Sequence, residues 1–157
     1  MKKLFITLFL VMILCTEAYA SDWVKVDKYN YINLDSVSNY IDDNDKIQPN
    51  KKVCLMKRLN TDGYFKDIEK KVNKKIESDL SFVIFDFKTN KYTRKTQACF
   101  DAKGKVVYSV VYQNNKLIWK DMPSGSAPAN WAYLVKNENI LRKMQAAQKN
   151  PQIKNKK

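Results

Sequence analysis

The segment Leu80-Ser81-Phe82-Val83-Ile84-Phe85-Asp86-Phe87 decides the fold of this chain. Its apolar residues are nearly continuous, and its β-branched and aromatic side chains favour extended structure. A short apolar run of this kind is typical of a strand inside a sheet rather than at its edge. We therefore predict a central β-strand here.

Segments on both sides of this strand repeat the β pattern. In residues 52–59, Cys54, Met56 and Arg58 fall on one face, and Val53, Leu55 and Leu59 fall on the other. Three further β-rich segments follow the central strand: 92–100, 106–112 and 117–120. The connections between them are short and rich in turn-forming residues, so the sequence predicts an antiparallel meander.

A C-terminal helix is expected after the last of these segments. Ser126 is a good N-cap, and Pro128 falls in the first turn, where a missing N–H does no harm. Apolar residues such as Trp131 and Leu141 then form one helical stripe over about residues 127–145. The predicted fold class is α+β: an antiparallel β-sheet meander packed against a C-terminal α-helix. A short amphipathic helix fits residues 65–77.

The first twenty residues have the order of a secretory signal peptide. A basic start, Met1-Lys2-Lys3, precedes an apolar run over 4–14, and Ala18-Tyr19-Ala20 provides a cleavage motif before Ser21. The run is about half the ~20 residues that span a bilayer, which disfavours a membrane anchor. Leu14 precedes Cys15, where lipid attachment requires a small residue. We expect export without lipidation, to the periplasm, the cell envelope or the medium.

Positive charge is concentrated near the C-terminus. The chain has 157 residues and a formal net charge of +13, about half of it within residues 136–157. From Gln145 onward the sequence is too polar to bury apolar surface, which predicts a disordered basic tail. The expected division is therefore a signal peptide (1–20), an α+β domain (21–144) and a tail (145–157).

Lysines of two segments are candidate anion-binding residues, since exposed positive charge attracts anionic surfaces. They are Lys66, Lys70, Lys71, Lys74, Lys75, Lys149, Lys154, Lys156 and Lys157. The alternative is that both segments are solvated surface and contribute only to solubility.

The composition argues against familiar enzyme classes. Histidine is absent, which removes the commonest general base and zinc ligand, and three glycines are too few for a phosphate-binding loop. The acidic pairs Asp67/Glu69 and Glu77/Asp79 are interpreted as surface charge. We expect no catalytic residues, no cofactor and no metal site.

Two cysteines remain after removal of the signal peptide. Cys54 and Cys99 lie on β-type segments of an exported protein, and an oxidising compartment permits a disulfide. A bridge would close a loop of about 46 residues and add about 4 kcal/mol in the chain-entropy model. The alternative is two buried thiols that never meet. We predict the structural disulfide.

The order of motifs resembles the bacterial surface-adhesin protein E-like family. The motifs are Trp23-Val24-Lys25-Val26, Tyr31-Ile32-Asn33-Leu34-Asp35-Ser36, Tyr108 to Tyr112, and Trp119 to Ala127 with Trp131. The resemblance covers about residues 22–135. It implies an antiparallel sheet packed against a C-terminal helix, and the best-known members are envelope adhesins that bind host extracellular-matrix proteins. The pattern differs here in its cysteine positions, its lysine-rich segment and its basic tail.

Two functions from different classes follow. The first is an exported, non-catalytic binding protein of the bacterial envelope whose partner is a host extracellular-matrix protein. The alternative is a basic binder of anionic polymers, either a heparin-like glycan or nucleic acid, with Tyr108, Tyr112 and Trp119 stacking on sugars or bases. These aromatic residues would otherwise pack between the sheet and the helix.

Signal-peptide processing gives the first testable prediction. The mature protein is expected to begin at or near Ser21 and to carry no lipid, because Leu14 precedes Cys15. Intact-mass analysis of protein from the cell envelope measures this. A mass that includes diacylglycerol on Cys15 would contradict it.

Overall fold

The computed structural model describes residues 22–61 and 63–150. The predicted signal peptide, with Cys15, and residues 151–157 lie outside this range. The described part contains a sheet of nine strands: β1 (Trp23–Lys25), β2 (Asn30–Asn33), β3 (Ser38–Ile41), β4 (Ile47–Leu59), β5 (Ser78–Asp86), β6 (Lys91–Arg94), β7 (Thr96–Phe100), β8 (Val106–Val111) and β9 (Lys120–Asp121). Its helices are α2 (Lys66–Val72), α3 (Ala127–Lys136) and α4 (Glu138–Lys149), with 3₁₀ turns η1 (Leu34–Ser36) and η2 (Asn114–Lys116). The α+β fold class is confirmed.

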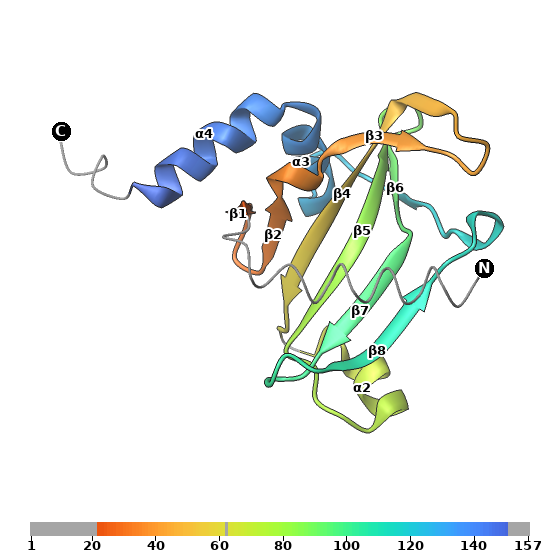
Figure 1. The fold of residues 1–157 in the computed structure, drawn as a ribbon, viewed down its shortest axis with the longest axis vertical. Helices are drawn as coiled ribbons and strands as arrows, with labels where there is room; N and C mark the ends of the chain where they lie inside the picture. The colour runs from red at the N-terminus through yellow and green to blue at the C-terminus, as the bar shows by residue number, and fades with distance from the viewer. Residues whose placement is uncertain (1–21, 62, 151–157) are drawn as a thin grey trace.

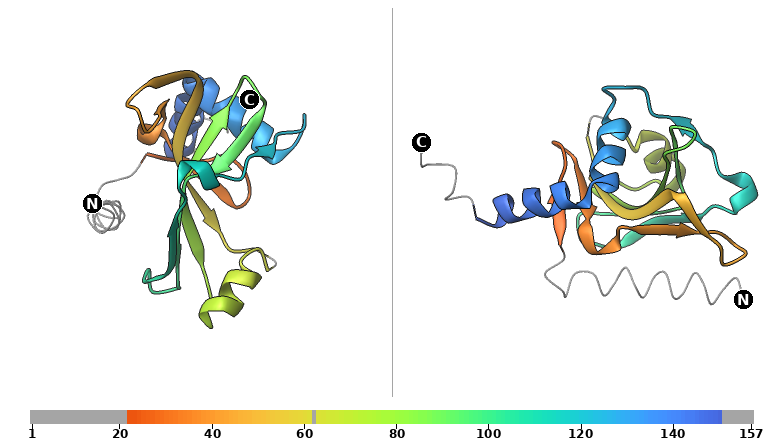
Figure 2. Two further views of the ribbon diagram at one scale, coloured as in Figure 1. Left: turned by 90° about the vertical axis from the view of Figure 1, so that its right-hand side faces the viewer. Right: turned by 90° about the horizontal axis from the view of Figure 1, so that it is seen from above.

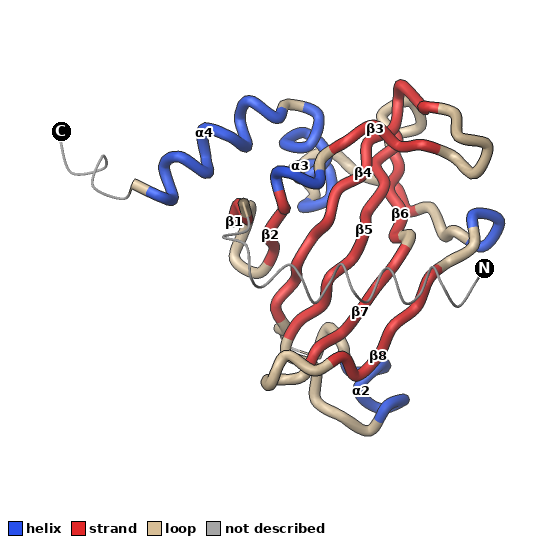
Figure 3. Tube along the Cα trace, viewed as in Figure 1, coloured by secondary structure: helices blue, strands red, loops and turns tan. Residues whose placement is uncertain are grey.

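Strand β5 lies inside the sheet, as its apolar sequence predicts. It pairs antiparallel with β4 along its whole length, and with β6 and β7 on its other side. The predicted strand over 92–100 is interrupted at Lys95, whose N–H donates to the Phe82 carbonyl at 2.8 Å. Figures 1 and 3 show these strands side by side.

The last predicted strand, over residues 117–120, does not extend the antiparallel meander as expected. Of residues 117–120, only Lys120 is in a strand, and β9 pairs with β6 rather than with β8. The Thr93 hydroxyl donates to the Ile118 carbonyl at 2.9 Å, which holds this segment beside β6 without a regular ladder.

The helices lie at two ends of the sheet. Figure 1 shows α3 and α4 at one end and α2 at the other, and Figure 2 gives the same arrangement from two further directions. The main core forms beneath α3 and α4, where Trp131, Val135 and Leu141 pack on Met56 and Phe85. A second cluster forms beside α2 from Phe65, Ile76 and Cys99, with Ile68 partly buried against it. The opposite face carries a smaller apolar cluster of Leu55, Leu80 and Ala98.

The C-terminal helical region is two helices rather than one. The predicted cap is confirmed, since Ser126 Oγ accepts from the Ala129 N–H at 3.3 Å. Asn137 then breaks the helix with a non-helical backbone (φ −112°, ψ 67°), and its N–H donates to the Tyr133 and Leu134 carbonyls. The break lets α4 turn toward β1, where Leu141 enters the main core.

Residues 145–149, which we expected in the tail, continue α4. Gln148 explains their order, because its side chain binds both the N–H and the carbonyl of Lys25 in β1, at 3.0 and 2.9 Å. Lys149 Nζ also lies 2.8 Å from an Asp22 carboxylate oxygen. The prediction of disorder was wrong for this segment because it used composition alone, and composition does not reveal contacts with a distant strand.

The structure contradicts the predicted disulfide, since Cys54 and Cys99 are free buried thiols. They lie on β4 and β7, with β5 between them; Cys54 is opposite Val83, and Cys99 is opposite Asp79. Four residues along β5 correspond to about 13 Å, and two strand spacings add about 9.5 Å across the sheet. A disulfide requires Cα atoms within about 7 Å.

Both cysteines are therefore expected to be detected as free thiols once the protein is unfolded. Burial raises the pKa of the Cys54 thiol far above its ordinary value and that of Cys99 to about 12, with a contribution at Cys99 from Asp79. Because the thiolate is the reactive form, both should react slowly with Ellman's reagent in native protein at pH 8. When the mature protein is denatured without reductant, the reagent should detect two free thiols per chain. A count of zero would indicate a disulfide between Cys54 and Cys99.

Candidate functional site

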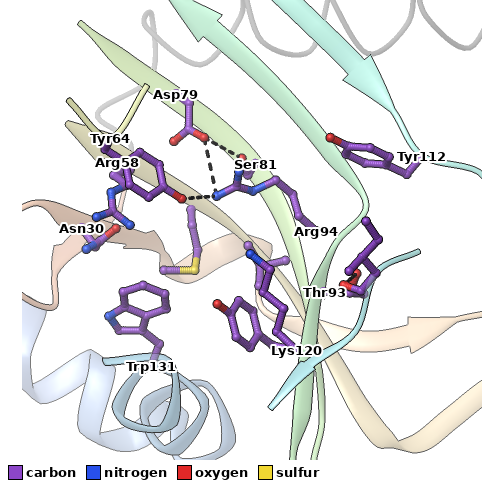
Figure 4. A pocket seen from close by; sticks show the side chains of 14 residues that line it. Asn30, Arg58, Tyr64, Asp79, Ser81, Thr93, Arg94, Tyr112, Lys120 and Trp131 are labelled. Atoms are coloured by element: carbon purple, nitrogen blue, oxygen red, sulfur yellow. Dashed lines mark hydrogen bonds and ion pairs between the residues drawn. The ribbon is translucent and has the colours of Figure 1, made fainter. Parts of the chain in front are cut away.

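A cavity of about 210 Å³ opens on the helix-covered face of the sheet. Its walls come from β2, β4, β5, β6 and β9, from α3, and from the loops that carry Tyr64, Tyr112 and Ile118. Figure 4 shows the side chains that line it. We call this cavity the arginine pocket, because Arg58 and Arg94 both line it.

Strand register brings the charged residues of the pocket together. Arg58 of β4 lies directly opposite Asp79 of β5. On the other side of β5, Arg94 of β6 lies opposite Val83. Val83 is four residues after Asp79 on β5 and therefore faces the same side of the sheet. Side chains alternate between the two faces with a period of two residues, so all three point to the pocket face.

Asp79 is the buried acid of the pocket, with 1% of its surface exposed. Its Oδ2 accepts from Gln97 Nε2 at 2.7 Å and from Ser81 Oγ at 3.1 Å, and lies 3.8 Å from Arg94 Nη2. Burial raises the pKa of the Asp79 carboxyl, and the charge of Arg94 offsets part of this effect. We interpreted Asp79 as surface charge, and the structure corrects this: its neighbour in sequence, Glu77, is exposed, whereas Asp79 is buried.

Arg94 is held by two partners. Besides its ion pair with Asp79, its Nη2 donates to the Tyr64 hydroxyl at 3.2 Å. Burial works to lower the pKa of Arg94, but the Asp79 carboxylate together with Tyr64 and Tyr112 outweighs it, so the pKa is raised. Arg94 therefore stays positively charged.

Arg58 has fewer charged and hydrogen-bonding partners than Arg94. Its guanidinium carbon lies 3.5 Å from the centre of the Tyr64 ring, a cation–π contact. It makes no ion pair within 4 Å with any described residue. Its Nε is buried without a hydrogen-bond partner in the described chain, as is that of Arg94. The pocket therefore contains positive charge and donors that no described residue satisfies.

Trp131 forms the wall on the helix side, and Asp27 fixes its position. Asp27 Oδ2 accepts from Trp131 Nε1 at 2.8 Å, while Oδ1 accepts from the backbone N–H groups of Tyr29 and Asn30, each at 2.9 Å. Burial favours a higher pKa for Asp27, but these hydrogen bonds outweigh it, so the pKa is lowered. One carboxylate thus connects the β1–β2 turn to α3.

The predicted anion-binding lysines do not line this pocket. Lys66, Lys70 and Lys71 lie on α2 and Lys74 and Lys75 follow it, all exposed. Lys149 is the last residue of α4 and pairs with Asp22, which directly precedes β1. Lys154, Lys156 and Lys157 lie outside the described residues. The structure therefore groups five of the nine lysines at α2 and separates Lys149 from them.

The aromatic residues expected to stack on sugars or bases have separate surroundings. Tyr112 lines the arginine pocket, whereas Tyr108 lies under Lys71 and Trp119 under Lys51, at 5.6 and 5.2 Å from nitrogen to ring centre. All three are half-buried.

Sequence reasoning missed the arginine pocket itself. The alternation over 52–59 placed Arg58 on the face of Cys54 and Met56, and the structure confirms this placement. A charged residue continuing an otherwise apolar strand face was the available signal. The partners Asp79 and Arg94 depend on register across three strands, which the sequence does not reveal.

Two further observations concern metal-ligating groups and membrane-spanning helices. Residues 22–61 and 63–150 bring together no group of three or more metal-ligating side chains. None of the helices in that part has the length and apolarity to cross a membrane.

The fold and the pocket define an α+β domain in which helices cover two ends of an antiparallel sheet and leave a polar pocket between them. Solved structures with this fold include protein E from non-typeable Haemophilus influenzae, with a TM-score of 0.52 and 15% sequence identity over 84% of this chain and 90% of that chain. A second structure of Haemophilus influenzae protein E has a TM-score of 0.48 and 15% identity, over 74% of this chain and 85% of that one. No protein-family model and no curated protein matches the sequence. The resemblance inferred from the sequence motifs is confirmed for the fold.

Replacing Asp27 tests the link between the β1–β2 turn and α3. Because its pKa is lowered in the folded state, the Asp27 carboxylate stabilises the fold above the ordinary value of about 3.8, and this stabilisation is lost as the pH falls through the lowered value. Asp27→Asn should reduce the free energy of unfolding by about 1–3 kcal/mol at pH 7. The difference from the unmodified protein should shrink below pH 3.8.

Urea unfolding at pH 7 and at pH 3 measures this. Asp121→Asn is the matched control, because Asp121 is 78% exposed and its contact with Lys91 is 3.7 Å. Exposed pairs contribute little, so this variant should change stability by less than about 0.5 kcal/mol. An Asp27→Asn effect that is equal at both pH values would contradict the role of the charge.

Proposed function

We propose that this protein is an exported, non-catalytic binding protein of the bacterial envelope whose partner is a host extracellular-matrix protein. The observation that carries the proposal is the protein E fold, which covers most of this chain, together with the family motifs in its sequence. The best-known members of that family are envelope adhesins. The predicted signal peptide supports export.

The pocket chemistry supports binding rather than catalysis. The buried acid, Asp79, accepts hydrogen bonds from Gln97 and Ser81 and is paired with Arg94, so its Oδ2 oxygen is already engaged. The second arginine and the aromatic walls offer charge and stacking surface instead of a proton acceptor. Such a lining can hold a ligand without transforming it.

Binding to immobilised matrix proteins tests the proposal. The mature protein should bind at least one of laminin, fibronectin and collagen with saturable kinetics in surface plasmon resonance. If an apolar interface dominates, the affinity should change by less than about ten-fold between 0.05 and 0.5 M salt. Binding to none of an extended matrix panel would contradict the proposal.

A second candidate function has its own observation in its favour. Five lysines, Lys66, Lys70, Lys71, Lys74 and Lys75, are exposed together at the α2 end of the sheet. The β7–β8 turn adds exposed Lys103 and Lys105 close by, since α2 contacts β8. This lysine surface would attract an anionic polymer such as a heparin-like glycan or nucleic acid.

Charge removal distinguishes this candidate from the first. Lys70→Gln/Lys74→Gln should elute from a heparin column at lower salt than the unmodified protein, because fewer condensed counterions are released on binding. On duplex DNA the salt slope should fall by up to about 0.9 per lysine. The matched control is Lys116→Gln/Lys143→Gln, which removes two exposed lysines elsewhere. Equal elution of both variants would show that the effect is net charge and would contradict a site at α2.

A further inference from the structure

We propose that the arginine pocket binds a sugar acid, a single six-membered sugar ring that carries a carboxylate. The proposal does not depend on the matrix-protein function, since it concerns a small ligand in a preformed cavity. It rests on the charge of Arg58, which no described carboxylate pairs within 4 Å, and on aromatic walls that border the same 210 Å³ cavity.

The charges of the pocket call for an anion. Asp79 provides one negative charge, and its contact at 3.8 Å is with Arg94. Arg58 remains without an ion pair among the described residues, and exposed Lys120 adds a further positive charge at the wall. A ligand with one negative group therefore enters a site that holds more positive than negative charge. Electrostatic attraction is stronger there than in bulk water because the pocket is partly enclosed.

The donors of the pocket favour a carboxylate. Arginine presents its N–H groups in a planar fork that matches the two oxygens of a carboxylate. The buried Nε atoms of Arg58 and Arg94 have no partner in the described chain, and buried donors in folded proteins are normally satisfied. The fork of Arg58, which makes no ion pair within 4 Å with any described residue, is the one that can donate to a ligand carboxylate.

The walls of the pocket favour a ring rather than a short acidic side chain. Trp131 and Tyr112 lie toward opposite sides of the pocket in Figure 4, and Tyr64 and Tyr92 also line it. Flat aromatic faces pack against the C–H surface of a sugar ring, which an aspartate or glutamate side chain lacks. A cavity of 210 Å³ is smaller than the about 300–1,000 Å³ of pockets for drug-sized ligands, so a single ring fits it best.

Hydroxyl groups of the pocket would complete the recognition. Tyr92 is half-buried, and burial, followed by the proximity of Tyr64, raises the pKa of its phenol. It therefore keeps its proton at neutral pH and can donate to a sugar hydroxyl. Tyr112, which follows β8 and also lines the pocket, offers a second phenol.

A nuclear magnetic resonance titration of the mature protein tests the proposal with four probes: sodium glucuronate, glucose, acetate and phosphate. The indole N–H of Trp131 is the reporter, because it lies at the pocket wall. Trp23, on β1, is the internal control. Glucuronate should shift the Trp131 resonance to saturation while the Trp23 resonance stays in place. Glucose, which lacks the charge, and acetate, which lacks the ring, should bind at least ten-fold more weakly.

Two variants locate the interaction. Arg58→Gln should weaken glucuronate binding about ten- to hundred-fold, as expected for the loss of a charge-assisted hydrogen bond, and Arg58→Lys should fall between because it keeps the charge without the fork. Lys136→Gln is the matched control, since Lys136 is also a cation above an aromatic ring, 5.6 Å from the centre of the Phe87 ring, but lies outside the pocket. Because Lys136 is also absent from the candidate anion-binding lysines, this variant should leave glucuronate binding unchanged.

Each other outcome would overturn the proposal. Acetate binding as tightly as glucuronate would indicate a site for a bare carboxylate, such as an acidic side chain of a protein. Equal binding of phosphate would indicate a general anion site, and no shift of Trp131 would exclude the pocket. The ligand comparison uses the unmodified protein, so it stands even if Arg58→Gln fails to fold.

Discussion

The antiparallel pairing of β4 with β5 is the constraint on which the rest of the structure depends. It runs from Lys51 opposite Asp86 to Leu59 opposite Ser78 without a register shift. This ladder places Arg58 opposite Asp79 and sets the apolar residues of β4 on alternate faces of the sheet. A slip of one residue would exchange the two faces and move Arg58 away from the pocket.

The pocket occupies the part of this ladder that the helices leave uncovered. At one end, α3 and α4 bury Met56 and Phe85 in the main core, and at the other end Phe65 and Ile76 pack beside Cys99. Between these clusters the same face carries Asp79 and the two arginines. A buried ion pair is weak support for stability, because desolvation offsets most of the attraction between the charges. Apolar residues in these positions would have joined the two clusters, so the charges of the arginine pocket add little to stability, which is consistent with the ligand site proposed above.

The sequence predicts those features that depend on local patterns. The apolar run over 80–87 identifies the central strand, the alternation over 52–59 places Arg58 on its correct face, and Ser126 begins α3 as its side-chain chemistry requires. Features that depend on tertiary contacts were not predictable. Asn137 breaks the helix without a glycine or proline, and residues 145–149 become helical where Gln148 reaches the backbone of β1. The predicted disulfide was wrong for the same reason, because the separation of Cys54 from Cys99 follows from the pairing of β5 with β4 on one side and with β7 on the other.

Positive charge has two different forms in this chain. The lysines at α2 are exposed, and an exposed ammonium attracts any anionic surface without fixing its geometry. The arginines of the pocket are held instead by defined partners: Arg94 by Asp79 and Tyr64, and Arg58 by the ring of the same tyrosine. Tyr64 therefore aligns both guanidinium groups at once, with its hydroxyl on one and its face on the other. Because a preorganised fork loses little conformational entropy when a ligand binds, the proposed selectivity for a small anion is assigned to the arginine pocket, and the proposed salt-dependent attachment is assigned to the lysines. In these proposals, net positive charge accounts for long-range attraction, whereas discrimination between ligands is assigned to two arginines that the net charge does not reveal.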